Sequence, residues 1–146
     1  MDDTIVWHAD DPEMQPEKAH PTDAGYDLIS PVTMDIARGL PAVIDTGVQI
    51  AIPFGYVGLI FPRSGAGSRG LVLQNGTGVI DSGYRGTITL VMALQEGTNA
   101  YHIDRGDRIA QMVIVPIFWA GKEEFSAEPL DTGTDRGTNG YGSTGM

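Results

Sequence analysis

The chain has 146 residues, the usual length of one domain, and 41% of them are hydrophobic against 19% charged, which is the globular range. It contains no cysteine, which excludes disulfides, thiolate nucleophiles and zinc–thiolate or iron–sulfur sites. The formal net charge is −10, whereas proteins that follow a nucleic-acid backbone gather Lys and Arg on one face. No apolar run approaches the roughly 20 residues of a membrane span, and the acidic N-terminus does not resemble a signal peptide. We therefore expect a cytoplasmic (intracellular) protein that binds neither membrane nor nucleic acid.

Apolar residues alternate with a period of two along several short runs, which is the side-chain period of a β-strand. In chain order, this alternation predicts strands over residues 47–52 and 87–92. The runs 56–61 and 109–119 predict buried strands, because they are rich in β-branched and aromatic residues. Runs of Gly, Pro, Asn and Asp separate them. One short helical turn is predicted after residue 62, with Ser64 as its cap. Many short strands joined by turns predict an all-β fold: a sandwich, a barrel or a jelly roll.

The C-terminal stretch differs from the rest of the chain. From Asp131 onward it is nearly free of aliphatic residues, so it cannot bury enough apolar surface to order itself. We expect residues 1–130 to form the β-domain and residues 131–146 to form a flexible C-terminal arm. Two interpretations stay open: a plain mobile terminus, or an arm that orders on a ligand through the Arg136 guanidinium and the Tyr141 ring.

Two short clusters precede the middle of the chain. Asp27, in the segment 23–28, is a carboxylate at the start of an apolar strand, although an Asp after Gly-x is often a simple turn residue. Arg63, Ser64 and Gly65 combine a guanidinium, a hydroxyl and a glycine amide at the predicted helix start. That combination suits an anion, and its alternative is an ordinary helix cap with a surface arginine.

Two further clusters follow. The glycine-rich segment 75–86 predicts a hairpin whose backbone a ligand can approach, with Asn75 at its start. Asp81 near its end is a candidate general base or a structural turn residue. Gln111 follows a Gly-Asp-Arg turn and offers a neutral donor, or simply leads into a core strand. The Gly-rich terminus lacks the lysine and the following helix of a phosphate-binding P-loop, which excludes that motif.

Taken in order, A-G-Y-D-L, P-R-S-G, G-V-I-D-S-G-Y-R-G, G-D-R-I-A-Q and R-G-T-N-G-Y-G-S-T-G resemble the five motifs of the trimeric deoxyuridine triphosphatases (dUTPases), over residues 24–145. The resemblance implies a jelly-roll-like β subunit that assembles as a homotrimer with shared active sites. It also implies hydrolysis of dUTP to dUMP and pyrophosphate, with Mg²⁺ held mainly by the triphosphate. Such an ion needs few protein ligands, in agreement with the lack of a dense carboxylate cluster in the sequence.

The same resemblance assigns roles to individual residues. Asp81 is expected to be the general base that activates the water attacking the α-phosphate, and Asp27 to contact the metal indirectly, through water. The other motif residues are expected to bind the substrate. The phosphates are bound by Arg63, Ser64, Gly65 and Gln111; the uracil by Asn75, Gly78, Val79 and Ile80; and the deoxyribose by Tyr84. The residues of the C-terminal arm are expected to bind the substrate as the arm closes over it: Arg136, Tyr141, Gly142, Ser143 and Thr144.

The chain departs from the usual family pattern at four positions: Tyr141 stands for Phe or His, Asn139 for Gly, Thr77 for Pro and Thr89 for Lys. Two other functions share features with this sequence. A deoxycytidine triphosphate deaminase has part of these motifs, but it needs a glutamate where this chain has Val91. A nucleotide-switched binding or signalling protein on the same scaffold is the alternative from another class.

Overall fold

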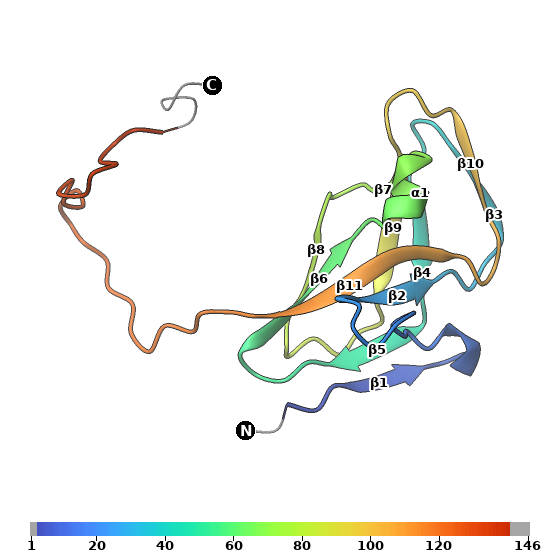
Figure 1. Ribbon diagram of the computed structural model, residues 1–146, viewed down its shortest axis with the longest axis horizontal. Helices are drawn as coiled ribbons and strands as arrows, with labels where there is room; N and C mark the ends of the chain where they lie inside the picture. The colour runs from blue at the N-terminus through green and yellow to red at the C-terminus, as the bar shows by residue number, and fades with distance from the viewer. Residues whose placement is uncertain (1–2, 141–146) are drawn as a thin grey trace.

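The structure is a computed structural model that describes residues 3–140, and nearly all of its regular elements are strands (Figure 1). In chain order the elements are β1 (Val6–Ala9), a 3₁₀ turn (Pro12–Met14), β2 (Gly25–Ile29), β3 (Met34–Ala37), β4 (Ala42–Asp45), β5 (Val48–Ala51), β6 (Tyr56–Phe61), α1 (Ser64–Ser68), β7 (Leu71–Leu73), β8 (Gly78–Ile80), β9 (Thr89–Leu94), β10 (Ala100–Ile103) and β11 (Arg108–Pro116).

The described strands form antiparallel sheets that enclose one core. A four-stranded sheet runs β2-β11-β6-β8 and a three-stranded sheet runs β4-β9-β7, while β1 pairs with β5 and β10 pairs with β3. Leu28 and Met112 of the first sheet share one buried cluster with Leu71, Leu90 and Met92 of the second. The alternation of buried and exposed residues in β4 and β9 is the period that predicted strands, and the all-β prediction is confirmed.

The predicted strands agree with the structure to within a few residues. β6 has the predicted bounds, β5 lies inside its predicted run, and β9 lies two residues further along the chain than predicted. β11 ends at Pro116 rather than at residue 119. A short helix does follow Pro62, but Ser64 as its cap was wrong: Arg63 is the N-cap residue, in an extended conformation, and its side chain makes no capping hydrogen bond.

The predicted hairpin over residues 75–86 was also wrong. The one strand in this segment, β8, pairs with β6, whereas β7 just before it pairs with β9 of the other sheet. The turn between β7 and β8 therefore connects two sheets instead of two paired strands. Gly76 has a φ of +74° in this turn, a conformation that glycine adopts without steric cost.

After β11 the chain leaves the body of the molecule (Figure 1). The Ile117 backbone amide still donates to the Gly55 carbonyl (2.9 Å), and the Trp119 ring packs edge-on against Phe54, with ring centroids 4.8 Å apart. Residues 121–140 are exposed. The division of the chain at residue 130 stays a prediction. Among residues 3–140, no helix is long and apolar enough to cross a membrane.

Candidate functional site

Asp27 is the centre of the first cluster of functional side chains. It lies in the middle of β2 opposite Gln111 of β11, and only 10% of its side chain is exposed. The Arg63 Nε atom lies 2.8 Å from Asp27 Oδ1, and the Arg108 Nε atom lies 3.7 Å from Oδ2. Because a buried carboxylate without a partner is costly, these two guanidinium groups provide the partners that Asp27 needs at this position.

A hollow of about 250 Å³ lies beside this ion pair, lined by Asp27, Arg63, Ser64 and Gln111 together with Ala19, Asp23, Ala24 and Gly25. The Gln111 amide donates from Nε2 to the Pro62 carbonyl (3.1 Å), which connects β11 to the start of α1. A Cβ atom on Gly25 would overlap Gln111 Oε1, so a larger residue at this position would displace the Gln111 side chain. Residues of the second motif (Arg63 and Ser64) and of the fourth motif (Gln111) thus lie around Asp27 of the first motif.

Ser64 and Gly65 form the first turn of α1, directly after Arg63. No heavy atom lies within 4 Å of a Cβ built on Gly65, so the backbone is open to a ligand at this point. Arg63, Ser64 and Gly65 together present a guanidinium, a hydroxyl and accessible amides on the rim of the hollow. These are the groups that bind phosphate oxygens in proteins.

A magnesium ion held directly by the protein finds little support in these side chains. Among residues 3–140, no group of three or more His, Asp or Glu side chains is placed to hold a metal ion. Asp27 also faces guanidinium groups with both oxygens. Magnesium retains several waters and is often bound through substrate phosphates, so a buried carboxylate that accepts a hydrogen bond from such a water fits Asp27.

The third motif forms a separate cluster around β8. β8 pairs with β6 on one side and is the last strand of its described sheet, which leaves the other side of its backbone free to bond a flat polar ligand. Asn75 Nδ2 donates to the Thr77 carbonyl (3.4 Å) in the preceding turn. After β8, the Tyr84 amide donates to the Asp81 carbonyl (3.1 Å), and the Tyr84 hydroxyl donates to the Thr87 carbonyl (2.9 Å).

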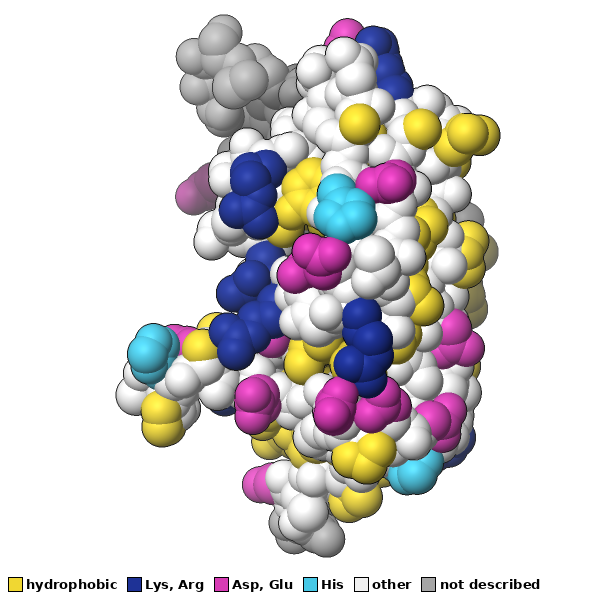
Figure 2. Space-filling view, turned by 90° about the vertical axis from the view of Figure 1, so that its right-hand side faces the viewer, with side chains coloured by type: hydrophobic (Ala, Val, Ile, Leu, Met, Phe, Trp, Pro, Cys, Tyr) yellow, Lys and Arg dark blue, Asp and Glu magenta, His cyan; other side chains and the backbone are white. Residues whose placement is uncertain are grey.

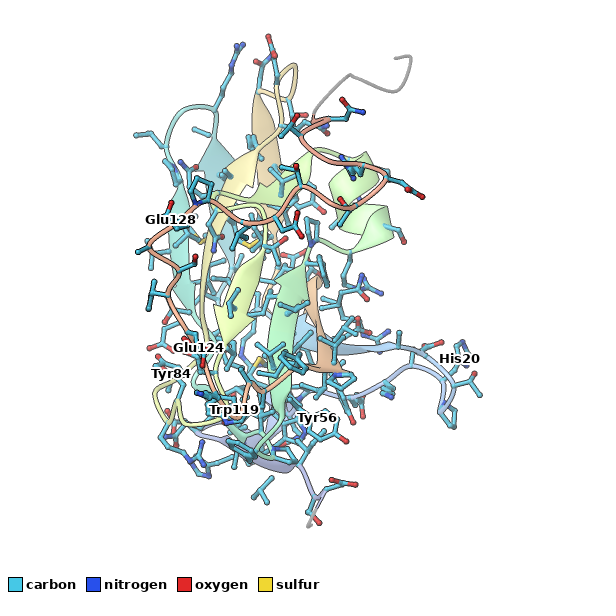
Figure 3. The ribbon with its side chains drawn as sticks, turned by 90° about the vertical axis from the view of Figure 1, so that its left-hand side faces the viewer. His20, Tyr56, Tyr84, Trp119, Glu124 and Glu128 are labelled. Atoms are coloured by element: carbon cyan, nitrogen blue, oxygen red, sulfur yellow. The ribbon has the colours of Figure 1, made fainter. Side chains whose placement is uncertain are left out.

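The two clusters lie far apart in one chain. Ile80, the residue before Asp81, pairs with Gly58 of β6, which in turn pairs with Ile114 of β11. Asp27 instead pairs with Gln111 of β11. Three strand spacings across the sheet and four residues along it place Asp81 roughly 20 Å from Asp27. Figure 3 agrees, because Tyr84 and His20, which mark the third motif and the loop before β2, lie on opposite sides of the body.

The arm is the remaining element of the expected site. Arg136 is exposed, and its Nε atom donates to the Asn139 carbonyl (2.9 Å) within the arm itself. Among the described residues, no contact joins Arg136 to either cluster. The four remaining arm residues lie outside the described part of the chain: Tyr141, Gly142, Ser143 and Thr144.

Reasoning from the sequence missed two neighbours of the site. Arg108 belongs to the fourth motif, but its position beside Asp27 depends on the pairing of β2 with β11, which connects residues about 80 positions apart. Asp23 lines the hollow, and its carboxylate accepts from the His20 amide (3.0 Å). The sequence feature that could have identified Arg108 is its position three residues before Gln111, since this spacing places both residues near the start of β11.

Comparison with known proteins gives a consistent result. The family model described as dUTPase matches residues 12–145. The deoxyuridine 5'-triphosphate nucleotidohydrolase of Cutibacterium acnes is 46% identical over all of this chain and 95% of its own length, and that of Tropheryma whipplei is 45% identical over 89% of this chain and 88% of its own.

Solved structures agree with this relationship. The dUTPase of Staphylococcus bacteriophage 80alpha with dUpNHpp superposes with a TM-score of 0.84 at 34% identity, covering 99% of this chain and 100% of its own. A mutant dUTPase from phage phi11 of S. aureus, described with a structural Mg(II) ion, gives a TM-score of 0.74 at 34% identity over 86% of this chain and 97% of its own. The fold is therefore the jelly-roll β fold of these proteins, as the motif resemblance implied.

Proposed function

Because the chain belongs to the dUTPase family, we propose that it is a dUTP diphosphatase, a hydrolase that converts dUTP into dUMP and pyrophosphate. The observation that carries the proposal is the convergence of Arg63, Ser64 and Gln111 on one hollow beside the buried Asp27. Phosphoryl transfer depends mainly on positioning and on stabilising charge, so guanidinium, hydroxyl and amide groups are the appropriate machinery.

In the proposed reaction, the Asp81 carboxylate accepts a proton from a water molecule as its oxygen attacks the α-phosphorus. The bond from the α-phosphorus to the bridging oxygen breaks, and pyrophosphate leaves. Arg63 stabilises the negative charge on the phosphates, with Ser64 and Gly65 as hydrogen-bond donors and Gln111 as a neutral one. Asp27 orients Arg63 through the 2.8 Å ion pair.

Magnesium would enter the hollow as an ion carried by the triphosphate, and Asp27 would accept a hydrogen bond from one of its waters. When bound, Mg²⁺ neutralises part of the phosphate charge. The residues of this chain then need to supply orientation and the base, which agrees with the small number of carboxylates around the hollow.

Substrate choice is assigned to the third motif. The free side of β8, at Gly78, Val79 and Ile80, offers backbone amides and carbonyls at the spacing of a strand partner, which suits the polar edge of uracil. Asn75 would add a side-chain amide, and Tyr84 would lie against the deoxyribose and leave no room for a 2′-hydroxyl. A close-fitting backbone also rejects the 5-methyl group of thymine.

A general base must lie within about 3 Å of the proton that it accepts, directly or through one water. Asp81 and Arg63 of one chain are too far apart to act on one triphosphate, which supports a homotrimer whose active sites combine Asp81 of one copy with Arg63 of another. The arm would close the site, with Arg136, Ser143 and Thr144 on the γ-phosphate, Gly142 giving close approach and Tyr141 stacked on uracil.

The test is to incubate the protein separately with dUTP, dTTP, UTP and dCTP in the presence of Mg²⁺ and to measure pyrophosphate and ammonia. We expect pyrophosphate from dUTP at a rate at least 100-fold above those from dTTP and UTP, which corresponds to about 3 kcal/mol of discrimination. Comparable rates on the three would contradict the specificity, and ammonia from dCTP would identify a deaminase.

A further inference from the structure

A second hollow, of about 440 Å³, lies next to the one just described and has Arg63 as the residue common to both. Its other charged or aromatic lining residues are Arg69, Tyr101, Asp107 and Arg108. None of the family motifs assigns a role to Arg69 or Tyr101. They come from the end of α1 and from β10, so the hollow extends from the phosphate-binding residues toward the β3–β10 pair.

The hollow is positively charged in a molecule that is strongly negative. Three of the nine Lys and Arg residues of the chain line it, against the lining carboxylate of Asp107 and the buried carboxylate of Asp27, which pairs with Arg63 and Arg108. The local balance is therefore positive, while the formal net charge of the chain is −10. The Asp107 carboxylate also accepts a hydrogen bond from the Asp104 amide (2.9 Å). In Figure 2, Lys and Arg side chains lie along the left of the view, and others lie at the top and below the centre, with acidic side chains between them.

Most N–H donors of the Arg69 guanidinium make no hydrogen bond with residues 3–140. Its Nη2 atom donates to the Tyr101 hydroxyl (3.1 Å), and its guanidinium carbon lies 5.9 Å from the centre of the Tyr101 ring. No carboxylate in residues 3–140 lies within ion-pair distance of Arg69. A guanidinium carries five N–H donors in a planar fork. Tyr101 therefore holds Arg69 at the hollow in a state ready to bind an anion with several oxygens.

We propose that this second hollow is an anion site for inorganic diphosphate, formed by Arg69 and Arg108 with Arg63 as the link to the first hollow. The inference rests on the proposed function, because diphosphate is the product that would leave the first hollow. A diphosphate bound by Arg63 can pass to Arg69 without crossing the acidic surface of the molecule, so the hollow serves as its exit path and gives product binding a defined place.

The experiment is titration calorimetry of sodium pyrophosphate into the purified full-length protein, with Mg²⁺, at low and at high salt. The variant Arg69→Gln is expected to weaken binding at least tenfold, because it removes a charged, forked donor. Arg69→Lys is expected to give an intermediate affinity, since lysine keeps the charge and loses the fork. The matched control is Arg38→Gln, an exposed arginine on the turn after β3, which should bind as the wild type does.

Circular dichroism establishes that each variant is folded. If Arg69→Gln does not fold, Tyr101→Phe tests the same site by removing the hydroxyl that holds Arg69, with an expected loss of two- to threefold. Wild-type affinity in Arg69→Gln, or an equal loss in Arg38→Gln, would overturn the proposal. Wild-type protein that binds pyrophosphate but releases none from dUTP would overturn the proposed function and leave this site standing.

Discussion

At the residue scale, the site depends on one buried carboxylate and one exposed carboxylate with different tasks. Asp27 is enclosed, and its oxygens face Arg63 and Arg108, so we propose that it holds positive charge at the hollow. Asp81 is exposed after an edge strand, where a substrate water can reach it. A general base must be free to accept a proton, and a carboxylate already shared by two guanidinium groups is poorly suited to that.

We expect Asp81→Asn to keep dUTP binding and to lower kcat by about 10²–10⁴, because the amide keeps the size of the side chain and cannot accept the proton. Steady-state kinetics and titration with a non-hydrolysable dUTP analogue separate the two effects. The matched control is Asp3→Asn, an exposed carboxylate near the N-terminus. Turnover of Asp81→Asn within a few-fold of the wild type would make Asp81 structural.

At the element scale, the turn between β10 and β11 is fixed on both sides, and it sets the position of the fourth motif. Arg105 pairs with Glu13 (3.0 Å) and with Asp11, and its amide donates to Thr33 Oγ1 (2.9 Å). Gly106 has a φ of +96°, which a residue with a side chain rarely adopts. These contacts hold the start of β11, and with it Arg108, against the body of the molecule.

His102, in β10 just before this turn, is a pH-sensitive group. Its Nδ1 atom lies 2.7 Å from Asp35 Oδ1, and its Nε2 atom lies 2.9 Å from Asp104 Oδ1. The hydrogen bond with Asp35, followed by that with Asp104, raises the pKa of His102 above its ordinary value. Both ring nitrogens face acceptors, which only the protonated imidazole satisfies completely.

A raised pKa means that the folded state binds this proton more tightly than the unfolded state does. The stabilisation by His102 is therefore fully present below the unfolded pKa of about 6.5 and is lost as the pH rises through the higher folded pKa. We expect the melting temperature of the wild type to exceed that of His102→Gln at pH 5.5, with a difference that shrinks toward pH 9. Asp35→Asn should reduce the difference, and a gap that grows with pH would contradict this assignment.

At the scale of the whole molecule, one chain carries two separate clusters of candidate site residues, and the segment after β11 carries large apolar side chains that the body of the chain does not cover. Phe118 is 92% exposed, and Phe125 is fully exposed in the segment that follows β11. Large apolar side chains in such positions are typical of surfaces that meet a partner. Together with the separation of Asp81 from Arg63, this supports the proposed homotrimer.

Co-expression of two inactive variants tests the sharing of sites. If Asp81 and Arg63 act from different copies, Asp81→Asn and Arg63→Gln chains mixed in equal amounts should form trimers in which about a quarter of the sites are intact. We expect pyrophosphate release from dUTP to recover to that level, while each variant alone stays inactive. No recovery in mixed trimers, confirmed by mass spectrometry, would mean that each copy works alone. An active monomer in light scattering would reject the trimer itself.

Truncation after Leu130 tests the arm. We expect a folded oligomer with severely reduced turnover, because stacking of an aromatic ring on a base contributes about 1–3 kcal/mol and a charge-assisted phosphate contact adds a similar amount. Tyr141→Phe should be mild because the ring remains, and Tyr141→Ala should raise the KM for dUTP. Full activity in the truncated protein would reduce the arm to a plain linker.

The sequence by itself determined the strand class and the inventory of the site. Period-two alternation and enrichment in β-branched and aromatic residues are local properties of the chain, so the first located β5 and β9 and the second located β6 and β11. The five motifs identified the family from residue types alone. Residue types in the motifs also limited the chemistry, because Arg63, Asp81 and Gln111 can bind phosphate, accept a proton and donate a hydrogen bond wherever they lie.

Only the tertiary structure decided which of these residues meet. β7 and β8 are separated by four residues in the chain, yet they belong to different sheets, which local turn chemistry could not reveal. Arg63 reaches Asp27 across 36 positions, while Asp81, closer to Arg63 in sequence, lies at the other side of the same sheet. Strand pairing depends on burying apolar faces between distant segments, so the register, and with it the division of the site between clusters, exists only in the folded chain.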